Sequence, residues 1–310
     1  MAALVTLFGG GGFLGRYVAE ALMRTGTRVR IAQRNPRAAF FLETLAKVGQ
    51  VQLVAADIRD PAQVRAAVAG SDSVVNLIGL LRGDFEGVHV GGAGNVAGAA
   101  ASAGTGALVH VSAIGADPDS PSVYGRTKSE GEQMVRAAFP AATIVRPSLI
   151  FGREDNFVNR FAALARLSPL LPVIRPAMRM QPVYAADVGR AVAIAALDSR
   201  AYGGRTYELG GPQVMTMHEL IAWICRTTGH GRVLVDIPDP VSRLIARLTG
   251  WLPMAPITWD QWLMLSRDNL VAPGAKGLEA FGLPKTPLIA VAEGWMSLYR
   301  RHGRFAKSPY

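Results

Sequence analysis

The chain has 310 residues, half of them hydrophobic, and 33 lysines and arginines against 23 acidic residues give a formal net charge of +10. Its one cysteine excludes an internal disulfide and is typical of a reducing compartment. Without a signal-peptide pattern or an apolar run of about 18 residues, we expect a soluble or peripheral protein. The charge favours a membrane surface or an acidic protein face as partner over nucleic acid, because no nucleic-acid motif accompanies it.

The N-terminus combines a short apolar strand with a glycine-rich turn. Residues 4–8 predict a buried parallel strand, and a helix follows the turn. Glycines at 9, 12 and 15 let the backbone turn sharply, so that free N–H groups of the helix can hold a phosphate. We expect a dinucleotide here, and the alternative is a glycine-rich hairpin without a ligand. The residues expected to contact the dinucleotide are Gly9, Gly12, Phe13, Leu14 and Gly15.

Strand and helix patterns alternate through the first 150 residues. Such alternation predicts a Rossmann-type, doubly wound parallel sheet, an α/β fold that binds ligands beyond the carboxyl ends of its strands. The remaining residues, 151–310, suit a smaller C-terminal α/β lobe interleaved with this domain. Predicted strands cover residues 4–8, 28–32, 51–55, 73–78, 107–111 and 142–145, and predicted helices cover residues 13–25, 37–48, 61–69, 86–103 and 122–139.

Several strand-end positions concern the cofactor. Arg34 follows the second strand, where an acidic residue would hold the 2′-hydroxyl of NADH and an arginine accommodates the 2′-phosphate of NADPH. We therefore expect NADPH or NADP+ rather than NADH, unless Arg34 is only a solvated loop charge. Asp57, with Ile58 beside it, follows the third strand and could reach the adenine amino group. Ile78 and Gly79 end the fourth strand, where glycine permits the backbone to approach the cofactor.

A candidate catalytic trio follows the fifth strand. Ser112 ends that strand, and Tyr124 and Lys128 stand one helical turn apart on the next helix. The ammonium group would stabilise the phenolate and lower the pKa of Tyr124 below its usual value of about 10, as a general acid/base for hydride chemistry requires. Ser112 would orient a substrate carbonyl. A Tyr-x-x-x-Lys pattern alone is frequent by chance, but after a dinucleotide turn and a strand-end serine it indicates a reductase site.

This half of the chain resembles the short-chain dehydrogenase/reductase superfamily, on its glycine-rich turn and on Ser112, Tyr124 and Lys128. The resemblance implies that these three residues occupy the catalytic positions. It also implies that the nicotinamide lies near Pro147 and Ser148, after the sixth strand.

Three longer runs lie in the second half, at residues 146–157, 181–188 and 258–269. They resemble the nucleotide-binding accessory subunit of respiratory complex I (NADH:ubiquinone oxidoreductase) and its bacterial relatives, so that the likeness covers most of the chain. The resemblance implies an atypical short-chain dehydrogenase/reductase that binds NADPH tightly and serves assembly and stability of the complex. Sugar epimerases and dehydratases share the fold, but Gly152-Arg153-Glu154 departs from the Gly-Pro that usually follows their aromatic residue.

The C-terminal lobe is expected to contain a docking surface. Trp251, Trp259 and Trp262, flanked by arginines, suit an interfacial surface, and the alternative is that they fill the cleft between the lobes. Short strands are predicted at residues 206–209 and 233–235, and helices at residues 217–228, 241–248, 259–265 and 289–300.

Two functions remain open on the sequence. The first is an NADPH-binding accessory or assembly subunit of complex I, peripheral on the cytoplasmic side of the inner membrane and docked through its C-terminal lobe. The second is an active, soluble cytoplasmic NADP-dependent oxidoreductase, reductase-like or epimerase-like, that acts on a small, quinone-like or lipid-like substrate. The family-specific runs favour the first function, and the intact trio favours the second. No metal site is expected, because the histidines are scattered along the chain.

Overall fold

The computed structural model describes residues 2–252, 255, 257–300 and 303. Contacts divide the chain into two compact units. The N-terminal unit consists of residues 1–147, 185–209 and 272–284, and the C-terminal unit consists of residues 148–184, 210–271 and 285–310. Each unit therefore collects segments that are far apart in the sequence.

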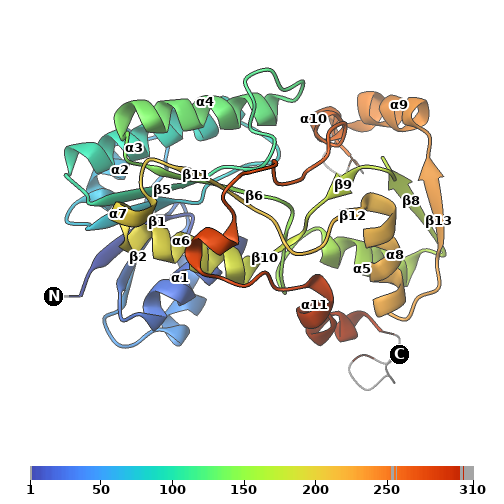
Figure 1. Cartoon of the computed structure of the whole chain (residues 1–310), viewed down its shortest axis with the longest axis horizontal. Helices are drawn as coiled ribbons and strands as arrows, with labels where there is room; N and C mark the ends of the chain where they lie inside the picture. Colours follow the sequence, from blue (N-terminus) through green and yellow to red (C-terminus); the bar gives the residue numbers. More distant parts are fainter. Residues whose placement is uncertain (1, 253–254, 256, 301–302, 304–310) are drawn as a thin grey trace. The chain divides into compact units, whose positions relative to one another are not determined.

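A seven-stranded parallel sheet is the centre of the N-terminal unit (Figure 1). Its strand order is β11-β6-β5-β4-β1-β2-β3, so that the order reverses between β1 and β4. Ligands of such sheets bind beyond the carboxyl ends of the strands at the reversal. The predicted doubly wound α/β fold is confirmed. The strands are β1 (Leu4–Phe8), β2 (Arg28–Gln33), β3 (Val51–Ala55), β4 (Ser73–Asn76), β5 (Ala107–Val111), β6 (Thr143–Pro147) and β11 (Thr206–Leu209).

Helices cover both faces of this sheet. On one face α1 and α6 pack against each other, and they approach closely at Gly189, where a Cβ would lie 2.8 Å from the Tyr17 backbone. On the other face α2, α3 and α4 enclose a buried core of alanine, valine, leucine and isoleucine side chains. The helical segments are α1 (Phe13–Arg24), the 3₁₀ segment η1 (Pro36–Leu45), α2 (Pro61–Val68), α3 (Ala93–Ser102), α4 (Val123–Ala138), α6 (Ala185–Leu197), α7 (Ser199–Tyr202) and the 3₁₀ segment η3 (Leu278–Phe281).

The helix predicted over residues 86–103 is divided into a π-helix, η2 (Glu86–Gly92), and α3. Asp84 Oδ1 accepts a hydrogen bond from the Gly87 N–H at 2.8 Å, at the beginning of η2. Gly92 allows close packing, because a Cβ there would lie 2.5 Å from the Ile58 side chain. Packing against the neighbouring segment thus offsets part of the cost of glycine in a helix.

The C-terminal unit is built from short strand pairs and helices around its own core, which includes the thiol of Cys225. The segment 206–209, expected in the smaller lobe, instead extends the main sheet as β11, where Tyr207 and Leu209 are buried. The elements of the C-terminal unit are β7 (Ile150–Phe151), α5 (Val158–Leu167), β8 (Leu170–Ile174), β9 (Arg179–Met180), β10 (Val183–Tyr184), β12 (Met215–Thr216), α8 (Met217–Thr227), β13 (Val233–Ile237), α9 (Asp239–Thr249), α10 (Trp259–Met264), α11 (Leu288–Met296) and η4 (Ser297–Tyr299).

Two predictions about helices can be checked directly. The helix predicted over residues 217–228 forms as α8, and Thr216 caps it in a capping box with Glu219. Within the described part of the chain, no helix combines the length and the apolar character needed to cross a bilayer.

Candidate cofactor and catalytic site

The glycine-rich turn between β1 and α1 has the geometry of a phosphate cradle. Gly9 has a φ of +82°, a left-handed conformation that glycine adopts without strain. At Gly15 a Cβ would lie 2.4 Å from the Gly9 carbonyl oxygen, so the first turn of α1 rests on the loop. Gly12 is the N-cap of α1, and none of the described side chains caps this end. The N–H groups at Phe13 and Leu14 therefore begin a helix whose N-terminus suits an anion.

Gln33 anchors this cradle to the end of β2. Its Oε1 accepts a hydrogen bond from the Gly11 N–H at 2.9 Å. The next residue, Arg34, is exposed, and its charge helps to lower the pKa of Asp57. Arg34 and Asp57 therefore lie close enough at this edge of the sheet to interact electrostatically.

Asp57 and Ile58 follow β3 as predicted. Hydrogen bonds from Arg59, whose guanidinium lies 2.6 Å from Asp57 Oδ2, lower the pKa of Asp57 to about 2. The Ile58 side chain is buried, and its carbonyl oxygen accepts a hydrogen bond from Asn95 Nδ2 at 3.0 Å. Asp57 is thus ionised at neutral pH with an arginine beside it.

Ile78 and Gly79 lie between the cradle and the candidate catalytic trio. A Cβ at Gly9 would lie 3.0 Å from the Ile78 side chain, and a Cβ at Gly79 would lie 3.2 Å from Lys128 Nζ. The ends of β1 and β4 and the middle of α4 therefore meet at one edge of the sheet. Residue spacing alone does not predict this convergence. It follows from the parallel sheet, in which the carboxyl ends of the strands lie at one edge.

The predicted trio lies at the carboxyl end of β5. Ser112 is 5% exposed, and no described residue gives or accepts a hydrogen bond at its Oγ. A buried hydroxyl without a partner is costly, so this atom suits a ligand contact. Lys128 is buried as well, and its Nζ donates to the Val111 carbonyl oxygen at 3.1 Å. The cradle and the unbonded hydroxyl fit a dinucleotide with its reactive end near β5.

The electrostatics of the Tyr124–Lys128 pair differ from the prediction. Burial raises the pKa of Tyr124 to about 12, and burial lowers the pKa of Lys128 to about 8. The expected lowering of the Tyr124 pKa is wrong, because the loss of hydration of both groups outweighs the attraction that their i and i+4 spacing suggests. Tyr124 therefore holds its proton at neutral pH.

His89, on the π-helix η2, is a site residue that the sequence analysis does not identify. Its Nε2 accepts a hydrogen bond from the Leu80 N–H at 2.9 Å, and its Nδ1 lies 3.0 Å from Thr127 Oγ1 on α4. Its ring meets the Tyr124 ring edge-on, with centroids 5.4 Å apart. Burial and the charge of Lys128 lower the pKa of His89 to about 3, so the imidazole is neutral. His89 thus ties the backbone after Gly79 to the helix that carries Tyr124 and Lys128.

A second buried histidine lies on β5 beside the trio. His110 Nδ1 is 3.2 Å from Asn76 Nδ2 on β4, and Asn76 Oδ1 accepts the Ile78 N–H. Burial, with a smaller effect of Lys128, lowers the pKa of His110 to about 3. No partner for its Nε2 occurs among the described residues. Since Asn76 donates to Nδ1, Nε2 carries the proton and is a second donor without an acceptor at this end of the sheet.

Pro147 and Ser148 stand at the junction of the two units. Pro147 ends β6, where its carbonyl oxygen accepts the Ile114 N–H at 3.1 Å. In the C-terminal unit Ser148 Oγ lies 2.6 Å from Asn269 Oδ1, and it also accepts the Gln181 N–H at 3.2 Å. The segments 146–157, 181–188 and 258–269 therefore meet through hydrogen bonds among Ser148, Gln181 and Asn269.

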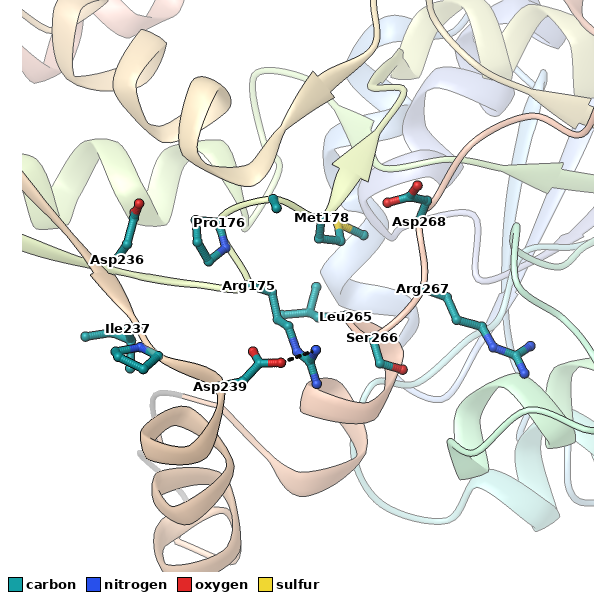
Figure 2. Close-up of a pocket in the computed structure, with 12 residues that line it drawn as sticks. Arg175, Pro176, Met178, Asp236, Ile237, Asp239, Leu265, Ser266, Arg267 and Asp268 are labelled. Atoms are coloured by element: carbon teal, nitrogen blue, oxygen red, sulfur yellow. Dashed lines mark ion pairs between the residues drawn. The ribbon is translucent and has the colours of Figure 1, made fainter.

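A pocket of about 620 Å³ lies beyond the carboxyl ends of β8 and β13 in the C-terminal unit (Figure 2). Arg175 at its centre has a φ of +54°, forms an ion pair with Asp239 at 2.5 Å, and places its Cζ 4.3 Å from the centroid of the Trp262 ring. The other two acids of the wall are paired as well, Asp236 with His218 and Asp268 with Arg179. Two of the three carboxylates therefore have arginine partners, and the third has a histidine partner.

The three tryptophans of the C-terminal unit have different surroundings. Trp262 is buried and donates to Ser242 Oγ at 3.0 Å, and Trp259 stacks on it with ring centroids 5.2 Å apart. Trp251 is 78% exposed. Of the segment between them, Pro253, Met254 and Pro256 lie outside the described residues. Trp262 thus packs in the interior of this unit, Trp259 lies half-buried against it, and Trp251 lies at the surface.

Comparisons with known proteins now identify the family. The model of the NmrA-like family matches residues 1–255. The chain belongs to the NmrA-like family. It is 36% identical to "NADH dehydrogenase [ubiquinone] 1 alpha subcomplex subunit 9, mitochondrial" of Mus musculus, over 92% of this chain and 77% of that protein. It is 30% identical to "NADH-ubiquinone oxidoreductase 40 kDa subunit, mitochondrial" of Neurospora crassa, over 98% of this chain and 81% of that protein. The predicted resemblance to complex I accessory subunits is confirmed.

Two further similar proteins have the names of a reductase and of a quinone oxidoreductase. The NmrA-like chain is 33% identical to "Ceramide reductase" of Caulobacter vibrioides, over 59% of this chain and 58% of that protein. The NADPH complex of the quinone oxidoreductase QOR2 from Escherichia coli has a TM-score of 0.77 at 23% identity, and the match covers 96% of this chain and all of that one. This structure supports the fold of the NmrA-like chain.

Proposed function

We propose that this NmrA-like protein is an NADPH-binding accessory or assembly subunit of respiratory complex I, in which the nucleotide has a mainly structural role. The observation that carries the proposal is the similarity to complex I subunits along almost the whole chain. The cofactor cradle of the N-terminal unit supports the proposal. Gly9 permits the sharp turn after β1, and Gly15 lets α1 approach this turn closely, so that backbone N–H groups can hold a phosphate. We expect the protein on the cytoplasmic side of the inner membrane, attached peripherally.

The choice of NADPH over NADH rests on the end of β2. Arg34 is exposed there and acts electrostatically on Asp57, so a 2′-phosphate would bring a negative charge to a guanidinium that is accessible to it. The glycine cradle would hold the pyrophosphate, and Lys128 beside Gly79 would lie along the cofactor backbone. When bound, the cofactor supplies a hydride.

The structural role of the cofactor follows from its effect on stability. A ligand that binds only the folded state stabilises it by about 4 kcal/mol at a thousand-fold excess over Kd, so loss of NADPH should loosen the N-terminal unit.

We expect the C-terminal unit to dock on complex I and on the membrane surface. The chain carries a net charge of +10, which is attracted to anionic lipid or to an acidic protein face. Nucleic acid is not an expected partner, because no nucleic-acid motif accompanies this charge.

Co-purification tests the proposal. A tagged chain, expressed from its own locus, should isolate complex I from detergent-solubilised membranes and should leave washed membranes only at high salt. The matched variants are Arg34→Asp, at the carboxyl end of β2, and Arg28→Asp, at the exposed opposite end of the same strand. We expect only Arg34→Asp to weaken the association. A wild-type chain that isolates no complex I subunit contradicts the proposal.

A second candidate function is an NADP-dependent oxidoreductase acting on a small, quinone-like or lipid-like substrate. The buried, unbonded Ser112 Oγ favours it, next to the Val111 carbonyl to which Lys128 donates, and so does the similarity to a ceramide reductase. In that case Ser112 would orient the substrate carbonyl, and the Tyr124 hydroxyl would give its proton to the carbonyl oxygen as the hydride arrives. Tyr124→Phe should then abolish turnover and leave NADPH binding nearly unchanged. Full activity of this variant excludes the assigned role.

A further inference from the structure

The helix α9 of the C-terminal unit presents three distinct stripes of side chains. Ser242 and Ala246 are buried and fix the inward face. Val241, Leu244 and Leu248 point away from the core and are 48%, 57% and 64% exposed. Their spacing of three and four residues places them on one side of the helix. The helix therefore has one face that packs against the core and a separate apolar face that is exposed to solvent.

The apolar stripe continues beyond the end of α9. Trp251 is 78% exposed and Leu252 is 38% exposed, directly after the last turn. The indole N–H of Trp251 donates to the Leu248 carbonyl oxygen at 2.8 Å. Because this donor is already bonded, the ring can enter an apolar medium without an unsatisfied polar group. An exposed stripe of this length is unusual for a surface that stays in water.

Basic side chains lie next to the apolar stripe. Arg243 and Arg247 are exposed and stand one turn apart on α9. Arg247 Cζ lies 5.5 Å from the centroid of the Trp259 ring, which holds the guanidinium at the surface. The acid of this helix, Asp239, forms an ion pair with Arg175 at its N-terminus. The outward half of α9 therefore combines apolar and positively charged surface.

We propose that α9 and Trp251 form a lipid-binding surface that lies in the interface of an anionic bilayer, with the apolar stripe toward the acyl chains and the arginines on the phosphates. A bilayer offers an apolar layer and a layer of negative charge side by side, which is the arrangement that the two stripes require. An acidic protein face satisfies the arginines but leaves the leucines and the tryptophan without an apolar partner. This inference rests on the proposed function in one respect, because the proposed function identifies the membrane as the one that contains complex I.

Vesicle flotation of the purified full-length protein with NADPH tests the inference. The probes are vesicles of phosphatidylcholine alone and of phosphatidylcholine with phosphatidylglycerol. We expect binding to the anionic vesicles only. The double variant Leu244→Glu/Leu248→Glu should bind at least about ten-fold more weakly, and Arg243→Gln/Arg247→Gln should lose about five-fold per arginine. Leu45→Glu, at a leucine that is 57% exposed in the N-terminal unit, is the matched control and should bind as the wild type does.

Fluorescence quenching tests whether the Trp251 ring reaches the acyl chains of the bilayer. Phosphatidylcholine with brominated acyl chains, mixed into the anionic vesicles, should quench part of the protein fluorescence, and Trp251→Phe should remove that part. All variants should melt at the wild-type temperature, because the changed side chains are exposed in the protein. Equal vesicle binding by the Leu244→Glu/Leu248→Glu variant and the wild type overturns the inference. So does the absence of wild-type binding to anionic vesicles.

The vesicle assay contains no complex I, which separates the inference from the proposed function. A chain that isolates complex I from membranes but binds no vesicle overturns the bilayer surface and leaves the subunit role intact. A chain that binds vesicles through α9 but isolates no complex I overturns the subunit role alone. If the leucine variant loses complex I while its vesicle binding is unchanged, α9 binds protein and the bilayer assignment is wrong.

Discussion

Each unit breaks the usual rule that apolar side chains are buried and charged side chains are exposed. The N-terminal unit buries a charged side chain, and the C-terminal unit exposes apolar ones. The N-terminal unit buries the ammonium of Lys128, and its charge acts on two buried neutral histidines, His89 and His110. The C-terminal unit exposes Leu248 and Trp251. Burying a charge and exposing an apolar surface both reduce stability, and the fold requires neither. We interpret both as binding surfaces, the first for a small polar ligand and the second for an extended apolar and anionic one.

The largest effect is expected from the buried lysine. Burial lowers the pKa of Lys128 to about 8, below the usual value of about 10.4, so between these pH values the unfolded chain binds a proton that the native chain lacks. The free energy of unfolding should therefore rise with pH in this window, by at most about 1.4 kcal/mol per pH unit. Lys128→Met should remove this rise. Urea unfolding of the cofactor-free protein in steps between pH 8 and 10 measures it.

The matched control for this experiment is Lys47→Met, because Lys47 is exposed in the same unit. It should keep the wild-type pH dependence. If Lys128→Met and the wild type have the same slope, the lysine is hydrated in solution, and the contrast between the two units disappears.

His89 tests whether the buried polar cluster positions the cofactor strand. His89→Leu removes the acceptor of the Leu80 N–H and the partner of Thr127, which should reduce the free energy of unfolding by about 2 kcal/mol. NADPH affinity should fall as well, because the backbone next to Gly79 loses its anchor. His218→Leu, at a half-exposed histidine paired with Asp236, should cost less than about 1 kcal/mol. Unchanged NADPH affinity in His89→Leu refutes the positioning role.

The smallest expected effect concerns the cofactor preference. If Arg34 binds the 2′-phosphate, Arg34→Asp should reduce the preference for NADPH over NADH by about ten-fold or more, since a charged hydrogen bond contributes about 1.5–3 kcal/mol. Calorimetric titration with both nucleotides measures the ratio, with Arg28→Asp as the control. A variant that keeps the wild-type ratio excludes Arg34 as the specificity residue.

The sequence predicts the sheet and most of its ligand edge for a simple reason. Parallel strands begin and end in a fixed order, so residues that follow strands, such as Gly9, Gly79 and Ser112, must meet at one edge. Helix spacing likewise places Tyr124 and Lys128 on one face. These relations depend on local pattern and topology, and the structure contains each of them.

The remaining features depend on packing that no local pattern contains. His89 is presented by a π-helix that packs against α4 at Gly131, where a Cβ would clash with the His89 carbonyl group. The direction of the Tyr124 pKa depends on burial, which the i and i+4 spacing does not reveal. The helix over 241–248 is predicted, but which of its apolar residues stay exposed depends on how α10 packs against it. The composition of residues 251–262 likewise does not distinguish the buried Trp262 from the exposed Trp251.

The structural role of the nucleotide is tested most directly by comparing two chromosomal variants. Gly12→Val fills the phosphate cradle at an exposed glycine, and Tyr124→Phe removes only a hydroxyl group. The measurement is the amount of the chain and of NADPH in complex I isolated from each strain. We predict that Tyr124→Phe assembles with wild-type NADPH content, whereas Gly12→Val lacks both the nucleotide and the bound chain. Normal assembly of Gly12→Val without NADPH, or failure of Tyr124→Phe with NADPH bound, would contradict this account.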